Sequence, residues 1–189
     1  MKENVKKIPK PVKYALFLAV LGLICGGLLG LVNYITSPII EDAIHEESLA
    51  ALEAENNTCD WSEVETSNDN IDNIYEGKIG NDLELVAYKI TTYGYKNGEI
   101  TTIIFIKESK IANITIISLK DQTSGIGTQV ENEDYLNSFI DKDIAVYEND
   151  DAIEHNSNSV DVISGATYSS RAIISAVIIA STNYSEDYR

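Results

Sequence analysis

The feature that most limits how this 189-residue chain can fold is a run without any charged residue near its N-terminus. The run lies between Lys13 and Glu41 and reads YALFLAVLGLICGGLLGLVNYITSPII. An α-helix needs about 20 apolar residues to cross a bilayer, so this run is long enough to do so. We therefore predict a single transmembrane helix over residues 14–36, preceded by a basic arm over residues 1–13.

The same run admits two other interpretations. A cleaved signal peptide also has a lysine-rich start and an apolar centre, although this run is longer than such a peptide requires. A lipoprotein signal would use Cys25, but Ile24 stands where a signal peptidase requires a small residue. A retained span is the interpretation that we prefer.

The basic residues of the arm predict how the span is oriented. Lysines before a span favour a cytoplasmic N-terminus, which places the remainder of the chain on the extracytoplasmic side of the cell membrane. These lysines are Lys2, Lys6, Lys7, Lys10 and Lys13. Small residues recur on one face of the span at Gly22, Gly26 and Gly30, and such a face permits close approach of another transmembrane helix, although glycine is also common in spans.

The charge of the chain excludes one class of partner. The chain has 14 basic and 30 acidic residues, and removing the five lysines and Glu3 of the arm leaves 9 and 29. Nucleic-acid binding through phosphate contacts requires a basic face, so we expect none. We also expect no metal site, because neither His45 nor His155 has a partner at ligand spacing. Cys25 and Cys59 fall on opposite sides of the predicted membrane boundary and are not expected to pair.

The sequence after the span predicts an α+β fold. Three segments rich in isoleucine, valine, threonine and tyrosine predict an antiparallel sheet with one buried face. They cover residues 83–93, 99–108 and 110–120. We expect a connecting helix and an acidic loop over residues 37–73, the loop from residue 56, and a domain over residues 74–189. Within it we predict a helix over 133–142, a short strand leading into Ser164, and a final helix over 169–181 that is buried against the sheet.

The stretch DVISGATYSS, residues 161–170, carries the most distinctive chemistry. A helix N-terminus presents free backbone N–H groups that can hold a phosphate, and Gly165 and Ala166 leave the backbone approachable. Serine and threonine are also preferred N-cap residues, so SGAT could be only a turn and a cap. Composition and spacing leave both interpretations open.

The segment from Asp161 to Thr167 resembles a known signature. It matches the Asp-x-x-Ser/Thr-Gly-Ala-Thr motif of FMN-binding domains, in which a flavin transferase joins FMN to the last threonine through a phosphoester. The order of parts, including the pair Gly94 and Tyr95, resembles the G subunit of the Rnf electron-transport complex. The chain is less closely similar to the corresponding flavin-carrying subunit of the sodium-translocating NADH:quinone reductase.

A second loop carries part of the same resemblance. The family typically has Glu-Thr-Pro-Gly-Leu-Gly where residues 122–127 read Gln-Thr-Ser-Gly-Ile-Gly. The acid and the proline of that pattern are missing here, so Gln122 and Ser124 are not counted as expected site residues. Without the proline we also expect the loop to be less rigid. The resemblance implies that Thr167 holds the FMN phosphoryl group covalently and that Asp161 belongs to the maturation motif. It further implies cofactor contacts from Tyr95, Thr123, Gly125, Gly127, Ser164, Gly165, Ala166 and Ser169.

The resemblance implies a membrane-anchored electron carrier with covalent FMN. Its partners would be the flavin transferase during maturation and the other membrane subunits of an Rnf-type complex, which passes electrons between ferredoxin and NAD⁺ and is coupled to ion translocation. The chain would then be an electron-transfer subunit rather than an enzyme by itself, with no catalytic residue of its own. Two alternatives are a stand-alone anchored flavoprotein and a membrane-tethered binding module in which SGAT is only a helix cap.

Overall fold

The structure is a computed structural model that describes residues 9–147 and 160–188. The chain divides into two compact units, Met1–Ala43 and Ile44–Arg189. Three features singled out in the sequence lie outside the described residues: the first three lysines of the basic arm, the acidic segment 148–159, and His155 within that segment.

Helix α1, Lys10–Glu55, contains the predicted span. It is the one helix in the described part of the chain that is long and apolar enough to cross a membrane. Its side chains over residues 14–36 are all exposed. The expected connecting helix is confirmed as helical, but it continues α1 without a break, because Pro38 lies inside the helix and does not end it.

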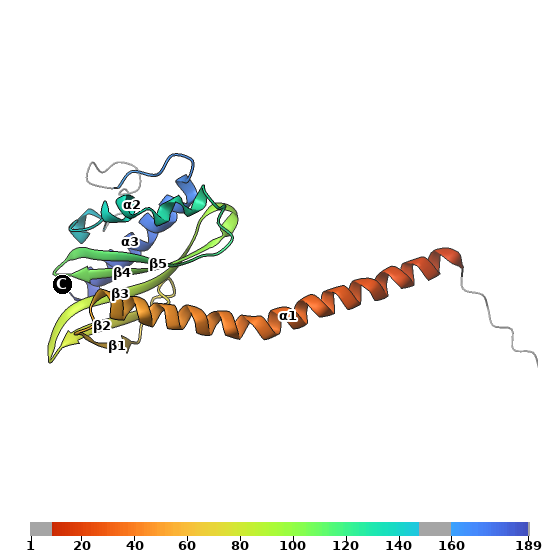
Figure 1. Cartoon of the computed structure of the whole chain (residues 1–189), viewed down its shortest axis with the longest axis horizontal. Helices are drawn as coiled ribbons and strands as arrows, with labels where there is room; N and C mark the ends of the chain where they lie inside the picture. Colours follow the sequence, from red (N-terminus) through yellow and green to blue (C-terminus); the bar gives the residue numbers. More distant parts are fainter. Residues whose placement is uncertain (1–8, 148–159, 189) are drawn as a thin grey trace, which may run out of the picture. The chain divides into compact units, whose positions relative to one another are not determined.

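The second unit is built on a five-stranded antiparallel sheet in the order β1-β2-β3-β4-β5, so each strand pairs with its neighbour in sequence (Figure 1). The strands are β1 Asp60–Val64, β2 Asn73–Ile79, β3 Asp82–Tyr93, β4 Glu99–Lys107 and β5 Lys110–Leu119. The three predicted strands are β3, β4 and β5, and the α+β class is confirmed.

Strand β1 corrects the prediction of a loop from residue 56 to residue 73. Its residues are mostly polar, and the strand is held by the ring of Trp61, which lies directly against Gly77 of β2. A Cβ at Gly77 would come within 2.8 Å of that ring. The indole also packs edge-on against Phe105, with ring centroids 6.2 Å apart. The packing of Trp61, together with antiparallel pairing to β2, therefore attaches a strand whose composition is typical of a loop.

Replacing Trp61 by alanine should lower the free energy of unfolding by about 2 kcal/mol, because the half-buried indole loses its contacts with β2 and β4. Urea unfolding of the detergent-solubilised chain measures this change. Ser62→Ala is the matched control on the same strand, and its exposed side chain should change stability by less than about 0.5 kcal/mol. Equal stability of the two variants would mean that β1 does not belong to the folded core.

Both faces of the sheet are buried, which corrects the expectation of one buried face. Helix α3, Thr167–Asp187, covers one face, where Tyr88 and Ile173 belong to the same core cluster. Leu52, near the end of α1, belongs to a second cluster with Phe105 on the other face. Double burial explains why β4 reads as the almost continuous apolar run EITTIIFIK.

The helices after the sheet differ from the predictions in three ways. Helix α2 covers only Glu133–Asn137, because Asp141 takes a left-handed backbone conformation and donates its N–H to the carbonyl of Ile111. The predicted strand before Ser164 is absent from residues 160–163, where the N–H of Ile163 bonds to a side chain instead of to the sheet. Helix α3 is longer than predicted, and its burial against the sheet is confirmed.

The described part of the unit also contains three short 3₁₀ helices: η1 Tyr95–Asn97, η2 Gly127–Glu131 and η3 Ile144–Val146.

Candidate functional site

The turn between β3 and β4 forms the first wall of the candidate site. Gly94 donates its N–H to the carbonyl of Gly98 over 2.9 Å, and Gly98 donates to the carbonyl of Tyr95 over 3.0 Å. Between them Lys96 and Asn97 have φ angles of 54° and 60°, in the left-handed region. This tight turn leaves the side chains of Tyr95 and Lys96 exposed at the end of the hairpin.

The loop after β5 forms the second wall, and Gln122 fastens it to the other two walls. The side-chain Nε2 of Gln122 donates to the carbonyl of Gly98 over 3.0 Å. Its Oε1 accepts from the hydroxyl of Ser169 over 2.8 Å. Gly127 donates its N–H to the carbonyl of Thr123 over 2.8 Å, which closes the loop. Gln122 was discounted as a site residue because it departs from the family pattern, yet this side chain joins all three segments of the site.

The turn before α3 forms the third wall. Ala166 is the N-cap, with no side-chain cap bond, and its N–H bonds to the carbonyl of Ile163 over 3.0 Å. Gly165 has a φ of 89° and open space where a Cβ would point. The first bond of the helix runs from the N–H of Ser170 to the carbonyl of Ala166 over 2.9 Å. The interpretation of SGAT as a serine or threonine cap is therefore wrong.

The first turn of α3 presents unused polar groups. Within the described residues, no hydrogen bond is made by the N–H groups of Thr167, Tyr168 and Ser169, the first three of the helix. The hydroxyl of half-buried Thr167 also has no partner among them. Free N–H groups at a helix N-terminus stabilise a phosphate placed there through hydrogen bonds and the helix dipole.

Behind this turn lies Tyr135, which holds α3 from the protein side. Its hydroxyl donates to the carbonyl of Ser170 over 3.3 Å. Burial raises the pKa of Tyr135 to about 12, so the phenol stays neutral and remains a donor throughout the physiological range. The start of α3 is therefore supported from within the core.

The three walls enclose a cleft of about 470 Å³. It is lined by Tyr95, Lys96, Thr123, Ile126, Gly127, Gly165, Ala166, Tyr168 and Ser169. The cleft thus brings together six of the expected site residues from three separate segments. They are Tyr95, Thr123, Gly127, Gly165, Ala166 and Ser169. The cleft has the size that is typical of a small-molecule site.

Four other expected residues do not line the cleft. Thr167 sits between two lining residues, Ala166 and Tyr168, with its side chain half-buried. Ser164 and Gly125 are exposed in the adjoining turns. Asp161 is exposed and also lies outside the lining.

Three lining residues were missed by the sequence analysis: Lys96, Ile126 and Tyr168. The rings of Tyr95 and Tyr168 lie 5.9 Å apart at 53°, and the ammonium of Lys96 lies 5.3 Å from the centre of the Tyr95 ring. Lys96 could have been found from the Lys-Asn-Gly turn that precedes β4, and Tyr168 from its place next to Thr167. Together these side chains give the cleft an aromatic rim with one positive charge.

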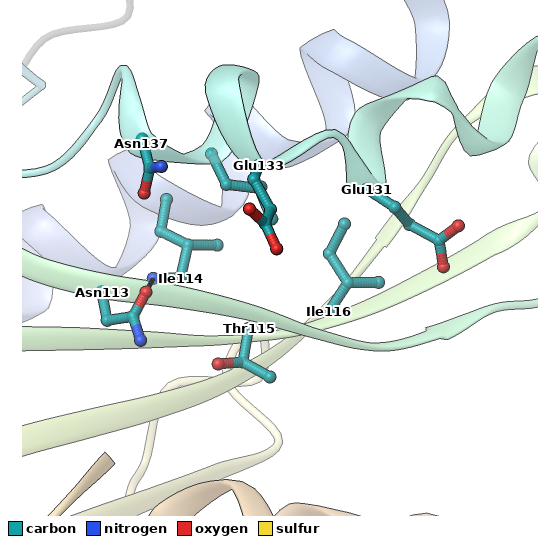
Figure 2. Close-up of a pocket in the computed structure, with 8 residues that line it drawn as sticks. Asn113, Ile114, Thr115, Ile116, Glu131, Glu133 and Asn137 are labelled. Atoms are coloured by element: carbon teal, nitrogen blue, oxygen red, sulfur yellow. Dashed lines mark hydrogen bonds between the residues drawn. The ribbon is translucent and has the colours of Figure 1, made fainter. Parts of the chain in front are cut away.

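Another hollow of similar size follows the edge strand β5 (Figure 2). It lies between residues 113–116 of β5 and the segment that carries Glu131 and Glu133, and the carboxylate of Glu133 points toward β5 in Figure 2. A second hollow on the sheet, next to Lys89, is lined by three carboxylates. Neither hollow contains an expected site residue, and their negative charge would repel a phosphate.

Comparison with family models identifies the two parts of the chain. Residues 94–181 match the FMN-binding domain, and this range contains all three walls of the cleft. Residues 1–54 match the RnfG N-terminal region. A comparison with curated protein sequences finds no match. The two family matches confirm the resemblance to RnfG-like FMN-binding proteins that the motifs predicted.

The cleft also fits FMN by its chemistry. Free N–H groups at the start of α3 suit the phosphate, the tyrosines and Ile126 suit an aromatic ring system, and the charged side chain in the lining is a cation. FMN supplies electron-transfer chemistry, while the protein supplies binding, orientation and electrostatics.

Proposed function

We propose that this RnfG-like FMN-binding protein is a membrane-anchored electron carrier that holds FMN covalently through a phosphoester to Thr167. The observation that carries the proposal is the position of the Thr167 hydroxyl. It has no partner in the described residues, it lies on the first turn of α3, and it adjoins the cleft. A diester formed there keeps one negative charge beside the free N–H groups of the helix.

Attachment would require no other residue of this chain as a nucleophile. A flavin transferase using FAD and magnesium would move the FMN moiety to Thr167. A bond forms between the threonine oxygen and the FMN phosphorus, the pyrophosphate bond of FAD breaks, AMP leaves, and the hydroxyl proton is lost. Gly165 and Ser164 are exposed, and the space beside Gly165 is open, so an enzyme can approach the backbone here. Exposed Asp161 would belong to the motif that the transferase reads.

Once the cofactor is in place, the residues of the cleft would orient the ring and keep it close to the protein. Tyr95, Ile126 and Tyr168 offer exposed apolar surface for it. Thr123, Gly127 and Ser169 supply small or polar groups from the second and third walls. Ser164 and Gly125 lie next to these walls and would shape the turns rather than contact the ring.

The chain would act as one subunit of an Rnf-type ferredoxin:NAD⁺ oxidoreductase coupled to ion translocation. Residues 1–13 would lie in the cytoplasm, residues 14–36 would cross the cell membrane, and the FMN domain would lie on the extracytoplasmic side. Its partners would be the other membrane subunits, and the chain would carry electrons rather than act as an enzyme alone. The exposed glycines Gly22, Gly26 and Gly30 on α1 are compatible with packing among other spans.

Purification in mild detergent separates this proposal from a stand-alone anchored flavoprotein. A subunit of a complex should retain other membrane proteins in amounts equal to its own, identified by mass spectrometry, because its span is packed among theirs. A stand-alone carrier should elute by itself. The same preparation in a denaturing detergent is the control, since it should release every non-covalent partner while the flavin stays on the chain.

The covalent link is tested by the flavin fluorescence of the denatured chain with and without the hydroxyl of Thr167. This measurement requires the flavin transferase but none of the other membrane subunits, so it tests the site before it tests the complex. A chain that lacks fluorescence would favour the membrane-tethered binding module.

A further inference from the structure

Lys96 is the only charged residue among the described residues that line the cleft. The chain as a whole has a formal net charge of −16, so the charge at its cofactor site is opposite in sign to the net charge of the protein. The hollow along β5 and the hollow beside Lys89 are both lined by more carboxylates than cations. Among these three hollows, an excess of positive charge is therefore found in the cleft alone.

The charge of Lys96 is not neutralised by a carboxylate of the described residues. The ion pairs there engage Lys78, Lys107 and Lys120. Lys96 instead places its ammonium 5.3 Å from the centre of the Tyr95 ring, at the rim of the cleft. An unpaired cation next to an aromatic rim keeps most of its field available to a bound anion.

The backbone at Lys96 adds a separate observation. The backbone angles φ and ψ of Lys96 are 54° and 33°, which lie in the left-handed region. Residues other than glycine, asparagine and aspartate rarely adopt this conformation. Glycine would adopt this conformation without steric cost, so the turn would be more favourable without a lysine. A residue that is kept in a disfavoured conformation at a functional site suggests that its side chain has a role there.

We propose that Lys96 raises the reduction potential of the FMN by placing its positive charge beside the isoalloxazine ring. The inference rests on the proposed function, because it requires FMN in this cleft. Reduction adds negative charge to the ring system, and a cation close to it stabilises the reduced form more than the oxidised form. The ring is the expected target rather than the phosphate, since the free N–H groups of α3 already serve the phosphate and Thr167 does not line the cleft.

The test is the midpoint potential of the flavin-loaded full-length chain in detergent, measured by spectroelectrochemical titration. Lys96→Gln should carry the same amount of flavin as the wild type and have a more negative midpoint potential. The wild-type potential should also fall as salt is added, because ions screen the ammonium, while the potential of Lys96→Gln should depend less on salt. The salt dependence is a signature that a merely structural role would not produce.

Three further variants control for charge, position and backbone strain. Lys96→Arg keeps the charge and should keep the potential. Lys110→Gln removes an exposed lysine at the far end of the β4–β5 hairpin, about 30 Å away by strand length, and should leave the potential unchanged. Lys96→Gly relieves the left-handed conformation, so it should melt at the same or a higher temperature while its potential falls.

Two results would overturn the proposal. Equal potentials for the wild type and Lys96→Gln, at equal flavin content, would show that the charge does not act on the ring. A loss of flavin content in Lys96→Gln with no change of potential would assign the lysine to the phosphate instead. Absence of flavin from the wild type is a different result, which would overturn the proposed function and would be seen before any variant is compared.

Discussion

Replacing Thr167 by valine should abolish the proposed covalent attachment of flavin and leave the domain folded. Valine has nearly the shape of threonine but no hydroxyl, so no phosphoester can form. The hydroxyl has no hydrogen-bond partner in the described residues and the side chain is half-buried, so stability should change by less than about 1 kcal/mol. The measurement is in-gel flavin fluorescence of the denatured chain after co-expression with a flavin transferase, next to a melting curve of the same preparation.

Two control variants test this prediction. One changes another threonine of the same helix, and the other changes Thr167 to a residue that keeps a hydroxyl. Thr182→Val makes the same substitution near the other end of α3 and should leave fluorescence unchanged. Thr167→Ser keeps a hydroxyl at the site and should retain at least part of the fluorescence. A bright Thr167→Val band would move the attachment to another residue, and a dark wild-type band beside a bright known substrate would remove the covalent link altogether.

Much of the fold follows from local patterns that the sequence displays directly. Strands β3 to β5 are long, rich in β-branched residues and separated by short turns, so their pattern is clear. The candidate span is equally clear, because its length and apolar composition are those that crossing a bilayer requires. Motifs of consecutive residues, such as the turn before Thr167, are also visible in the sequence alone.

The features that were missed depend on contacts between distant residues. Strand β1 is a short polar segment whose place in the sheet depends on Trp61 packing against Gly77 and Phe105. The role of Gln122 depends on bonds to Gly98 and Ser169, which lie 24 and 47 positions away. The turn that carries Lys96 is visible in the local Lys-Asn-Gly pattern, but its place beside the cleft depends on the bond between Gln122 and Gly98. No local pattern contains this information.

The second large effect that we expect is a loss of stability in Gly98→Ala, because Gly98 lies against the side chain of Gln122 that joins the walls of the cleft. A Cβ at Gly98 would overlap Nε2 of Gln122 and lie 2.8 Å from the carbonyl oxygen of Lys120. The φ of Gly98 is −64°, so an alanine there is limited by space and not by backbone conformation. Gly98→Ala should therefore push the β3–β4 turn away from the loop after β5. We expect the free energy of unfolding to fall by about 2 kcal/mol, which corresponds to a decrease of roughly 6 °C in the melting temperature.

Gly98→Ala should lower stability without preventing the attachment of flavin. Thr167→Val should have the opposite effect, since it prevents attachment and leaves stability nearly unchanged. In Gly98→Ala the hydroxyl of Thr167 is untouched, so the proposed attachment of flavin should still occur. The ring would then lie in a cleft whose walls have moved apart. The attached flavin should become more mobile, which lowers its fluorescence anisotropy relative to the wild type. Equal anisotropy in the two proteins would mean that the β3–β4 turn does not hold the ring.

A double-mutant cycle with Gln122→Ala shows whether the effect passes through the bridge. Gln122→Ala alone removes the bonds to Gly98 and Ser169 and should cost about 1 to 2 kcal/mol. In the double variant the methyl group introduced at position 98 no longer meets the amide, so the total loss should be smaller than the sum of the two single losses. Strict additivity would mean that the clash with the Lys120 carbonyl alone causes the loss in Gly98→Ala. A loss below the sum would show that one glutamine side chain couples the three walls of the cleft.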